Sequence, residues 1–296
     1  MNDENDNHQT PIIFHLPTVV YNVAYQASGM NVANTRFIIF NFWEKILQTN
    51  HEDQILRAIF LLKQMSNRLF IDIDLSNNLG QDTADGYRKA LGNLQFFANP
   101  RNVNHDFESA RKSRITEANL VRLQAMRDFF GSNVLTSQIS LGAVEYCVNE
   151  IDETIRHVAD NVRDLYISRY LHDELQFLKF CLKNFHYLGL LAINETAGKL
   201  VTNITSEKQN LHQNTVKKIG GVAFLLISLV STYGPFKSGV TEILGDMKDV
   251  LDLGSVVYSN LDDQDSIAIG ERQRVSDGDS APDSQARQLP GPENGE

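Results

Sequence analysis

Two aspartates in the first third of the chain are the residues whose spacing could most readily support chemistry. Asp72 and Asp74 fall in the stretch Phe70-Ile71-Asp72-Ile73-Asp74-Leu75, where apolar and polar residues alternate with a period of two. This alternation predicts a half-buried β-strand over residues 68–78, and a strand directs both carboxylates to the same face. That face could equally be the solvent face, so the spacing alone leaves a structural and a chemical interpretation open.

This short stretch resembles the paired-aspartate opening of haloacid-dehalogenase-type phosphatases. The resemblance implies that the carboxylates of Asp72 and Asp74 would hold a magnesium ion and that one of them would attack phosphorus. The chain departs from the family pattern further on, because no later lysine and no later acidic pair complete such a site. A metal-dependent, phosphatase-like enzyme is therefore kept as the second alternative function.

The other residue types that commonly carry chemistry are scattered. The eight histidines are dispersed, and the chain contains no His-Glu-x-x-His, no Gly-x-x-x-x-Gly-Lys-Ser/Thr and no Gly-x-Ser-x-Gly. Cys147 and Cys181 form neither a Cys-x-x-Cys pair nor a zinc-site spacing, so we expect two reduced, buried thiols. We therefore expect no cofactor and no metal, and a non-enzymatic role is favoured.

The net charge of −10 is concentrated at the two ends of the chain. Residues 1–10 contribute −3 and residues 271–296 contribute −3, which leaves −4 for residues 11–270. One basic cluster stands out, but no aromatic residues are interleaved with it: Arg111, Lys112, Arg114, Arg122 and Arg127. Residues 11–270 are mildly acidic overall, whereas binding to a phosphate backbone needs an excess of clustered cations. The basic cluster also lacks aromatic residues that could stack on bases, so nucleic acid is an unlikely partner. The polar first residues are unlike a secretory signal, which favours a cytoplasmic location.

Helical spacing of apolar residues dominates the first half of the chain. It predicts four helices, at residues 35–48, 52–66, 83–98 and 116–131. Residues 101–115 are expected to form a polar connection. Residues 11–26 combine two prolines with branched and aromatic apolar residues, which favours a short strand or an apolar arm.

A heptad pattern is the strongest signal in the second half. Seven aliphatic residues follow one another at alternating intervals of four and three, and we refer to them as the heptad seam: Val144, Val148, Ile151, Ile155, Val158, Val162 and Leu165. Such a seam packs against another helix, in the same chain or in a second one, and one sequence does not decide which. The seam is the candidate interaction surface, although packing within one chain is favoured.

The heptad rhythm resumes after a break of six residues, at Leu171, as it does at a stutter in a coiled coil. No proline occurs between Pro100 and Pro235, so helices of about 40 residues are compatible with this region. A second long helix is expected to be lined by a later set of apolar residues: Ile193, Ala197, Leu200, Ile204 and Leu211.

The uncharged segment at residues 219–236 could be a core helix or a membrane helix. As a helix it would span about 27 Å, slightly less than the roughly 30 Å of a bilayer core. Only residues 222–230 are densely apolar, so we expect a buried core helix. The alternative is membrane contact through four side chains: Phe224, Leu225, Leu226 and Leu229.

A long amphipathic helix that leads into an apolar segment ending in Ser231-Thr232-Tyr233-Gly234 resembles the stalk and first membrane helix of CorA-type magnesium channels. This resemblance implies a membrane channel, but Pro235-Phe236 stand where that family has Gly-Met-Asn after Tyr-Gly. The arrangement also resembles α-helical pore-forming toxins, which hide an apolar segment among long helices. The second resemblance implies a pore-forming effector.

We therefore expect a mainly α protein, a helical bundle with long amphipathic helices and one or two short strands near its start. Four parts are expected: an acidic disordered tail at 1–10, a smaller helical part at 11–131, a long-helix bundle at 132–260 and an acidic disordered tail at 261–296. The expected function is non-enzymatic interaction or self-assembly through amphipathic helix surfaces. A membrane-associating or pore-forming effector is the first alternative. The expected partner is another protein or a second copy, with a membrane as the alternative.

Overall fold

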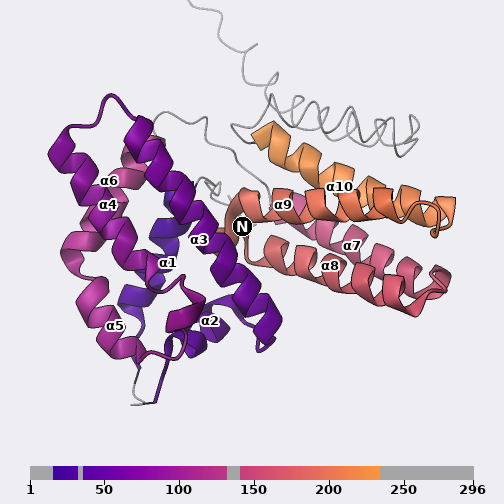
Figure 1. Cartoon of the computed structure of the whole chain (residues 1–296), viewed down its shortest axis with the longest axis horizontal. Coiled ribbons are helices and arrows are strands. Elements are labelled where there is room, and N and C mark those ends of the chain that lie inside the picture. Colours follow the sequence, from indigo (N-terminus) through magenta and orange to yellow (C-terminus); the bar gives the residue numbers. More distant parts are fainter. Residues whose placement is uncertain (1–15, 33–35, 132–140, 234–296) are drawn as a thin grey trace, which may run out of the picture. The chain divides into compact units, whose positions relative to one another are not determined.

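The computed structural model describes residues 16–32, 36–131 and 141–233, apart from the side chains at 131, 141 and 228–233. The helices of the first half are α1 (Leu16–Gly29), α2 (Ile39–Leu47), α3 (Glu52–Leu75), α4 (Gln81–Gln95), the short 3₁₀-helix η1 (Pro100–Asn102), α5 (Phe107–Arg114) and α6 (Glu117–Gly131). Those of the second half are α7 (Leu141–Asn161), α8 (Leu165–Lys183), α9 (Phe185–Ser206) and α10 (Gln213–Tyr233) (Figure 1). The predicted mainly α fold with bundle-like packing is confirmed.

The strand predictions for the first half are wrong wherever they fall on described residues, which contain no strand. Residues 16–29 form α1, and Pro17 lies in its first turn, where the missing N–H costs nothing and the fixed φ suits a helix. Residues 68–75 form the end of α3. There Ile73 is 2% exposed, whereas Ile71 is 50% and Leu75 is 72% exposed. The period of two is therefore a coincidence within a helical pattern.

Aromatic side chains form the centre of the first half. Phe42, Trp43, Phe97 and Phe107 are completely buried. The rings of Phe42 and Phe107 stack with their centroids 5.1 Å apart, and Trp43 Nε1 donates a hydrogen bond of 3.0 Å to the carbonyl oxygen of Phe97. Because large aromatic groups bury the most apolar area per residue, this cluster holds α2 and α5 together.

Helices α7 to α10 form a four-helix bundle. Helix α7 packs on α8, α8 on α9, α9 on α10 and α10 on α7, so the contacts close a ring. The connections between them are short, and consecutive helices therefore run antiparallel, side by side (Figure 1). The four helices contain 21, 19, 22 and 21 residues, so none of these described helices reaches the roughly 40 residues that the absence of proline would allow.

The heptad rhythm changes phase at a turn and not at a stutter. The turn occupies residues 162–164, directly before the six-residue interval from Leu165 to Leu171, which lies within α8. Helix α7 ends at Asn161, and Asp164 caps the new helix α8. Its Oδ1 accepts hydrogen bonds from the backbone N–H groups of Tyr166 at 2.8 Å and Ile167 at 3.1 Å. These bonds satisfy donors that have no partner inside the helix, which fixes where α8 begins.

Helix α9 is kinked at Gly189, and two helices of the first half pack against α9. Gly189 has φ +66° and ψ 176°, and α1 and α3 both contact α9. Close to the kink, Asn22 Nδ2 of α1 donates a hydrogen bond of 3.1 Å to the His186 carbonyl oxygen. A second connection joins α3 to α8, where the guanidinium of Arg57 lies 3.5 Å from the ring centre of Phe177.

Several predictions concern residues outside the described ones. These are the two tails at 1–10 and 261–296 and the part of the apolar segment beyond Tyr233. The boundary predicted between residues 131 and 132 also lies at the edge of a segment that is not described, so the two-part division stays a prediction.

Candidate functional site

A group of exposed apolar and charged side chains covers the outer face of α8 near its start. Leu165 is 85% exposed, Tyr166 is 82% exposed and Tyr170 is 37% exposed. Arg169 and Asp173 are exposed between and beyond them. We call these five residues the α8 surface. At 100° per residue they fall within an arc of about 140°, opposite the buried Ile167, Leu171, Leu175 and Leu178.

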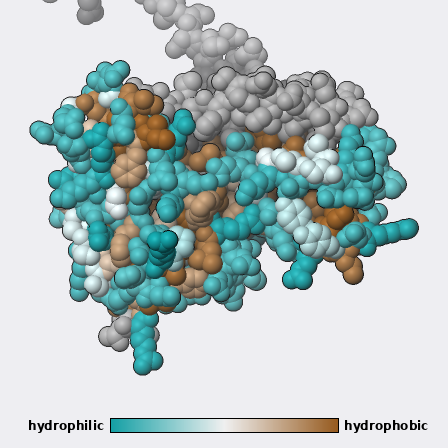
Figure 2. Space-filling view, in the orientation of Figure 1, coloured by the Kyte–Doolittle hydropathy of each residue, from teal (hydrophilic) through white to brown (hydrophobic). Residues whose placement is uncertain are grey.

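The charged side chains of the α8 surface have no partner in the described part of the chain. Neither Arg169 nor Asp173 makes an ion pair or a side-chain hydrogen bond with any residue that the structure describes. Tyr170 is held in place by Asn203 of α9, whose Nδ2 donates to the phenol oxygen. Burial raises the pKa of Tyr170, and the carboxylate of Glu174 adds to this effect. In Figure 2 apolar and near-neutral atoms gather around α8 and α9, bordered by hydrophilic ones.

The sequence reasoning missed most of this surface. It assigned Leu165 to the heptad seam and did not single out Tyr166, Arg169, Tyr170 or Asp173. A usable signal was present, because Asp164 is a good N-cap residue directly before an apolar run. A helix that starts there has its own phase, and Leu165 then belongs to the outer face.

The heptad seam lies mostly inside the bundle. Val144, Ile151, Ile155 and Val158 are at most 8% exposed. Val148 and Val162 are half-buried. Packing within one chain, the favoured alternative, buries most of the seam up to Val158. Little of its apolar surface is therefore exposed to a partner.

The apolar residues of α10 also face the bundle. Phe224 is 5% exposed and Leu226 is fully buried, while Leu225 is half-buried. The side chain of Leu229 lies outside the described residues. None of the described helices combines the length and the apolar character that crossing a bilayer demands.

The premise of a paired-aspartate site is wrong, because Asp72 and Asp74 lie on a helix. Two residues apart on α3, their side chains point about 160° apart, to nearly opposite sides of the helix. Each has an arginine partner: Arg68 Nε lies 3.5 Å from Asp72 Oδ1, and Arg88 Nη2 lies 2.7 Å from Asp74 Oδ1. Among the residues that the structure describes, no group of three or more His, Cys, Asp or Glu could hold a metal ion.

Arginines of the basic cluster around Arg111 make ion pairs and ring contacts with other residues of the chain. Arg111 donates two hydrogen bonds to Glu108, of 2.9 and 2.7 Å, and these hold the pKa of the Glu108 carboxyl down to about 2. Arg114 lies over the ring of Phe96, and Arg127 lies over the ring of Tyr21. The cluster is therefore a set of surface ion pairs and ring contacts.

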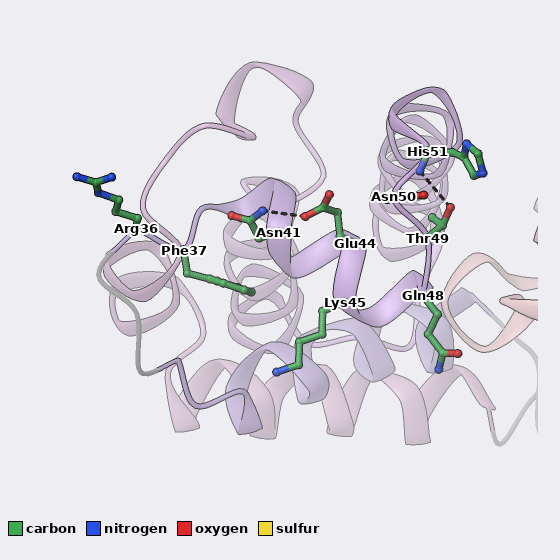
Figure 3. A pocket seen from close by; sticks show the side chains of 9 residues that line it. All are labelled: Arg36, Phe37, Asn41, Glu44, Lys45, Gln48, Thr49, Asn50 and His51. Carbon is green, nitrogen blue, oxygen red and sulfur yellow. Dashed lines mark hydrogen bonds between the residues drawn. The ribbon is translucent and has the colours of Figure 1, made fainter.

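An open, polar hollow of about 730 Å³ lies beside α2 and the α2–α3 turn. Its charged side chains do not converge: Arg36 and His51 lie at opposite ends, and Lys45 points away from Glu44 (Figure 3). Glu44 accepts a hydrogen bond of 2.8 Å from Asn41 Nδ2. No acid, base and nucleophile come together there, so the hollow lacks the geometry that catalysis needs.

The two cysteines are free and buried, as predicted. Burial raises the pKa of Cys147 and that of Cys181 to about 12. A thiol with such a pKa is almost entirely protonated near neutral pH and is therefore a poor nucleophile.

The α8 surface is thus a described feature with unused binding capacity. Its residues are held by a capped helix on a packed bundle, and its apolar groups are not needed by the core. No protein-family model, no curated protein and no solved structure matches the chain.

Proposed function

We propose that this protein is a non-enzymatic helical interaction protein that binds a protein chain through the α8 surface. The observation that supports this is the exposure of Leu165 and Tyr166, at 85% and 82%. Fully burying one leucine side chain is worth about 1.5–3 kcal/mol. The fold leaves this free energy unused at Leu165, although a polar residue at this helix start would serve folding equally well.

The composition of the α8 surface is that of a protein-binding site. Tyrosine and arginine are enriched among the residues that dominate binding energies, and two tyrosines and one arginine lie here around a leucine. They project from one helix whose position is fixed by the cap at Asp164 and the contact of Tyr170 with Asn203. A rigid presentation lowers the entropy lost on binding.

This proposal moves the interaction away from the heptad seam, whose central residues are buried in the bundle. The proposal also differs from the membrane alternative, in which α10 side chains contact lipid. Phe224 and Leu226 are buried, so contact of these side chains with lipid would require α10 to leave the bundle.

Photocrosslinking tests the proposed function. Benzoylphenylalanine would replace Tyr166 in the full-length chain, and a matched control would carry it at Tyr25, an exposed tyrosine of α1 (58% exposed). We expect a protein adduct at position 166 and none at position 25. Leu165→Asp in the chain that carries benzoylphenylalanine at position 166 should abolish the adduct, whether the partner is a second copy or another protein. The absence of any Leu165-dependent protein adduct at position 166, or an adduct with lipid alone, would overturn the proposal.

A further inference from the structure

We infer that the partner of the α8 surface is a second copy of this chain, with the two α8 helices packed antiparallel about a two-fold axis. The inference rests on the proposed function and names the occupant of that surface. It follows from the order of the charges along α8, from the position of the aromatic residues and from the balance of charge on the surface.

Arg169 and Asp173 are complementary to a copy of themselves. They lie four residues apart on one face of α8, and both are exposed. A basic residue that precedes an acidic one along a helix is the less favourable order for pairing within that helix. In an antiparallel pair of α8 helices, Arg169 faces Asp173 of the second copy. Two-fold symmetry then makes the same pair twice.

The aromatic residues fit this arrangement. With Arg169 opposite Asp173 of the second copy, the axis passes the exposed face of α8 at the level of residue 171, and the two copies of Tyr170 lie close to it. Leu165 and Tyr166 then lie over the region of the second α8 that contains Phe177. There the half-buried guanidinium of Arg57, which covers the Phe177 ring at 3.5 Å and pairs with Glu174 at 2.8 Å, offers a flat cation to an aromatic side chain.

The charge balance favours a second copy over other occupants. The α8 surface carries one basic and one acidic residue, and Arg163 and Asp164 border it as a further pair of opposite sign. A strongly acidic or strongly basic partner would meet a like charge here. An anionic bilayer would meet Asp164 and Asp173 together with the arginines.

The size of the surface predicts a weak dimer. Its three exposed apolar and aromatic side chains offer roughly 400 Å², about half of the 800 Å² per partner of a standard stable interface. We therefore expect a dimer that forms and dissociates with concentration, with a dissociation constant in the micromolar range.

Sedimentation velocity on purified full-length protein tests the inference through two charge reversals. Arg169→Asp and Asp173→Arg each place like charges opposite each other twice, so each variant alone should weaken the dimer by more than about tenfold. An equal mixture of the two variants restores both opposite-charge pairs. The mixture should therefore form a heterodimer as strong as the wild-type dimer. Arg101→Asp, which reverses an exposed arginine of η1, is the matched control and should leave the dimer unchanged.

The outcomes separate this inference from the proposed function. A wild-type chain that stays monomeric up to near-millimolar concentration, or a dimer that the mixture fails to restore, overturns the second-copy inference. A Leu165-dependent adduct at position 166 with a different protein would then leave the proposed function standing. Sedimentation with anionic vesicles that is lost in Leu165→Asp would overturn both in favour of a lipid surface. Circular dichroism of each variant establishes that the helices are intact.

Discussion

Replacing Gly189 by alanine should destabilise the protein, because two features of the structure oppose a side chain there. The backbone has φ +66° and ψ 176°, a region that is essentially restricted to glycine. Forcing another residue into such a conformation costs about 1–3 kcal/mol. A Cβ at this position would also lie 3.0 Å from Val19 Cγ2 and 3.6 Å from Met65 Sδ, so the Val19 side chain would have to move by a few tenths of an ångström.

Together the strain and the tight contact predict a loss of about 2–4 kcal/mol in the free energy of unfolding. Urea unfolding followed by circular dichroism measures it. In a double-mutant cycle with Val19→Ala, which by itself costs stability because Val19 is buried, the coupling free energy should equal the steric part of the Gly189→Ala effect. Gly198 of the same helix is the matched control, since it has a helical backbone and nothing within 4 Å of its added Cβ. Gly198→Ala should stabilise the protein by about 0.5–1 kcal/mol. A Gly189→Ala variant as stable as wild type would refute the reasoning.

Three further predictions follow from buried or paired groups. Ile151→Asp should lower the free energy of unfolding by several kcal/mol, because it places an unpaired carboxylate at a fully buried position; a wild-type urea midpoint would contradict this. Cys147 and Cys181 should react with a thiol reagent at pH 8 only after denaturant is added, because burial raises their pKa to about 12, and fast labelling of the native protein would argue against the packing around them. Glu108, whose pKa Arg111 lowers to about 2, should stabilise the native state above the ordinary pKa of 4.5 and lose this effect as the pH falls toward 2. Glu108→Gln should remove this part of the pH dependence of the thermal midpoint, and an identical profile in the variant would count against the ion pair.

The helices that the sequence predicted are those whose buried residues keep a helical period. Residues 35–48 contain α2, residues 83–98 overlap most of α4 (Gln81–Gln95), and α3 begins at Glu52 as the acidic first turn indicated. The prediction stopped α3 too early because apolar residues on its outer face, Ile71 and Leu75, imitate a strand. Periodicity identifies a buried face only when the exposed face is polar, and here it is not.

Helix α5 was missed because its stability comes from contacts that a local pattern does not contain. Its eight residues include only two buried ones, so a hydrophobic stripe is nearly absent. The Asp106 side chain accepts a hydrogen bond of 2.7 Å from the backbone N–H of Ser109, and Phe107 packs into the aromatic cluster. A cap and one tertiary anchor are enough for a short helix, but neither produces a period.

The α8 surface could not be inferred from the heptad pattern. Heptad spacing places residues on the same side of a helix only if the helix is uninterrupted between them. The heptad seam runs in phase through Val158, and those residues lie inside the bundle as a core stripe should. At Asp164 the helix restarts, and Leu165 falls on the solvent side of the new helix although it continues the old count. The same turn therefore removes Leu165 from the core and brings it next to Tyr166, Arg169 and Tyr170. Since the ring of four helices uses the inner stripes of all its members, any association of this region has to use residues outside those stripes. Leu165 and Tyr166 are the most exposed large apolar side chains that the described part of the chain offers for it.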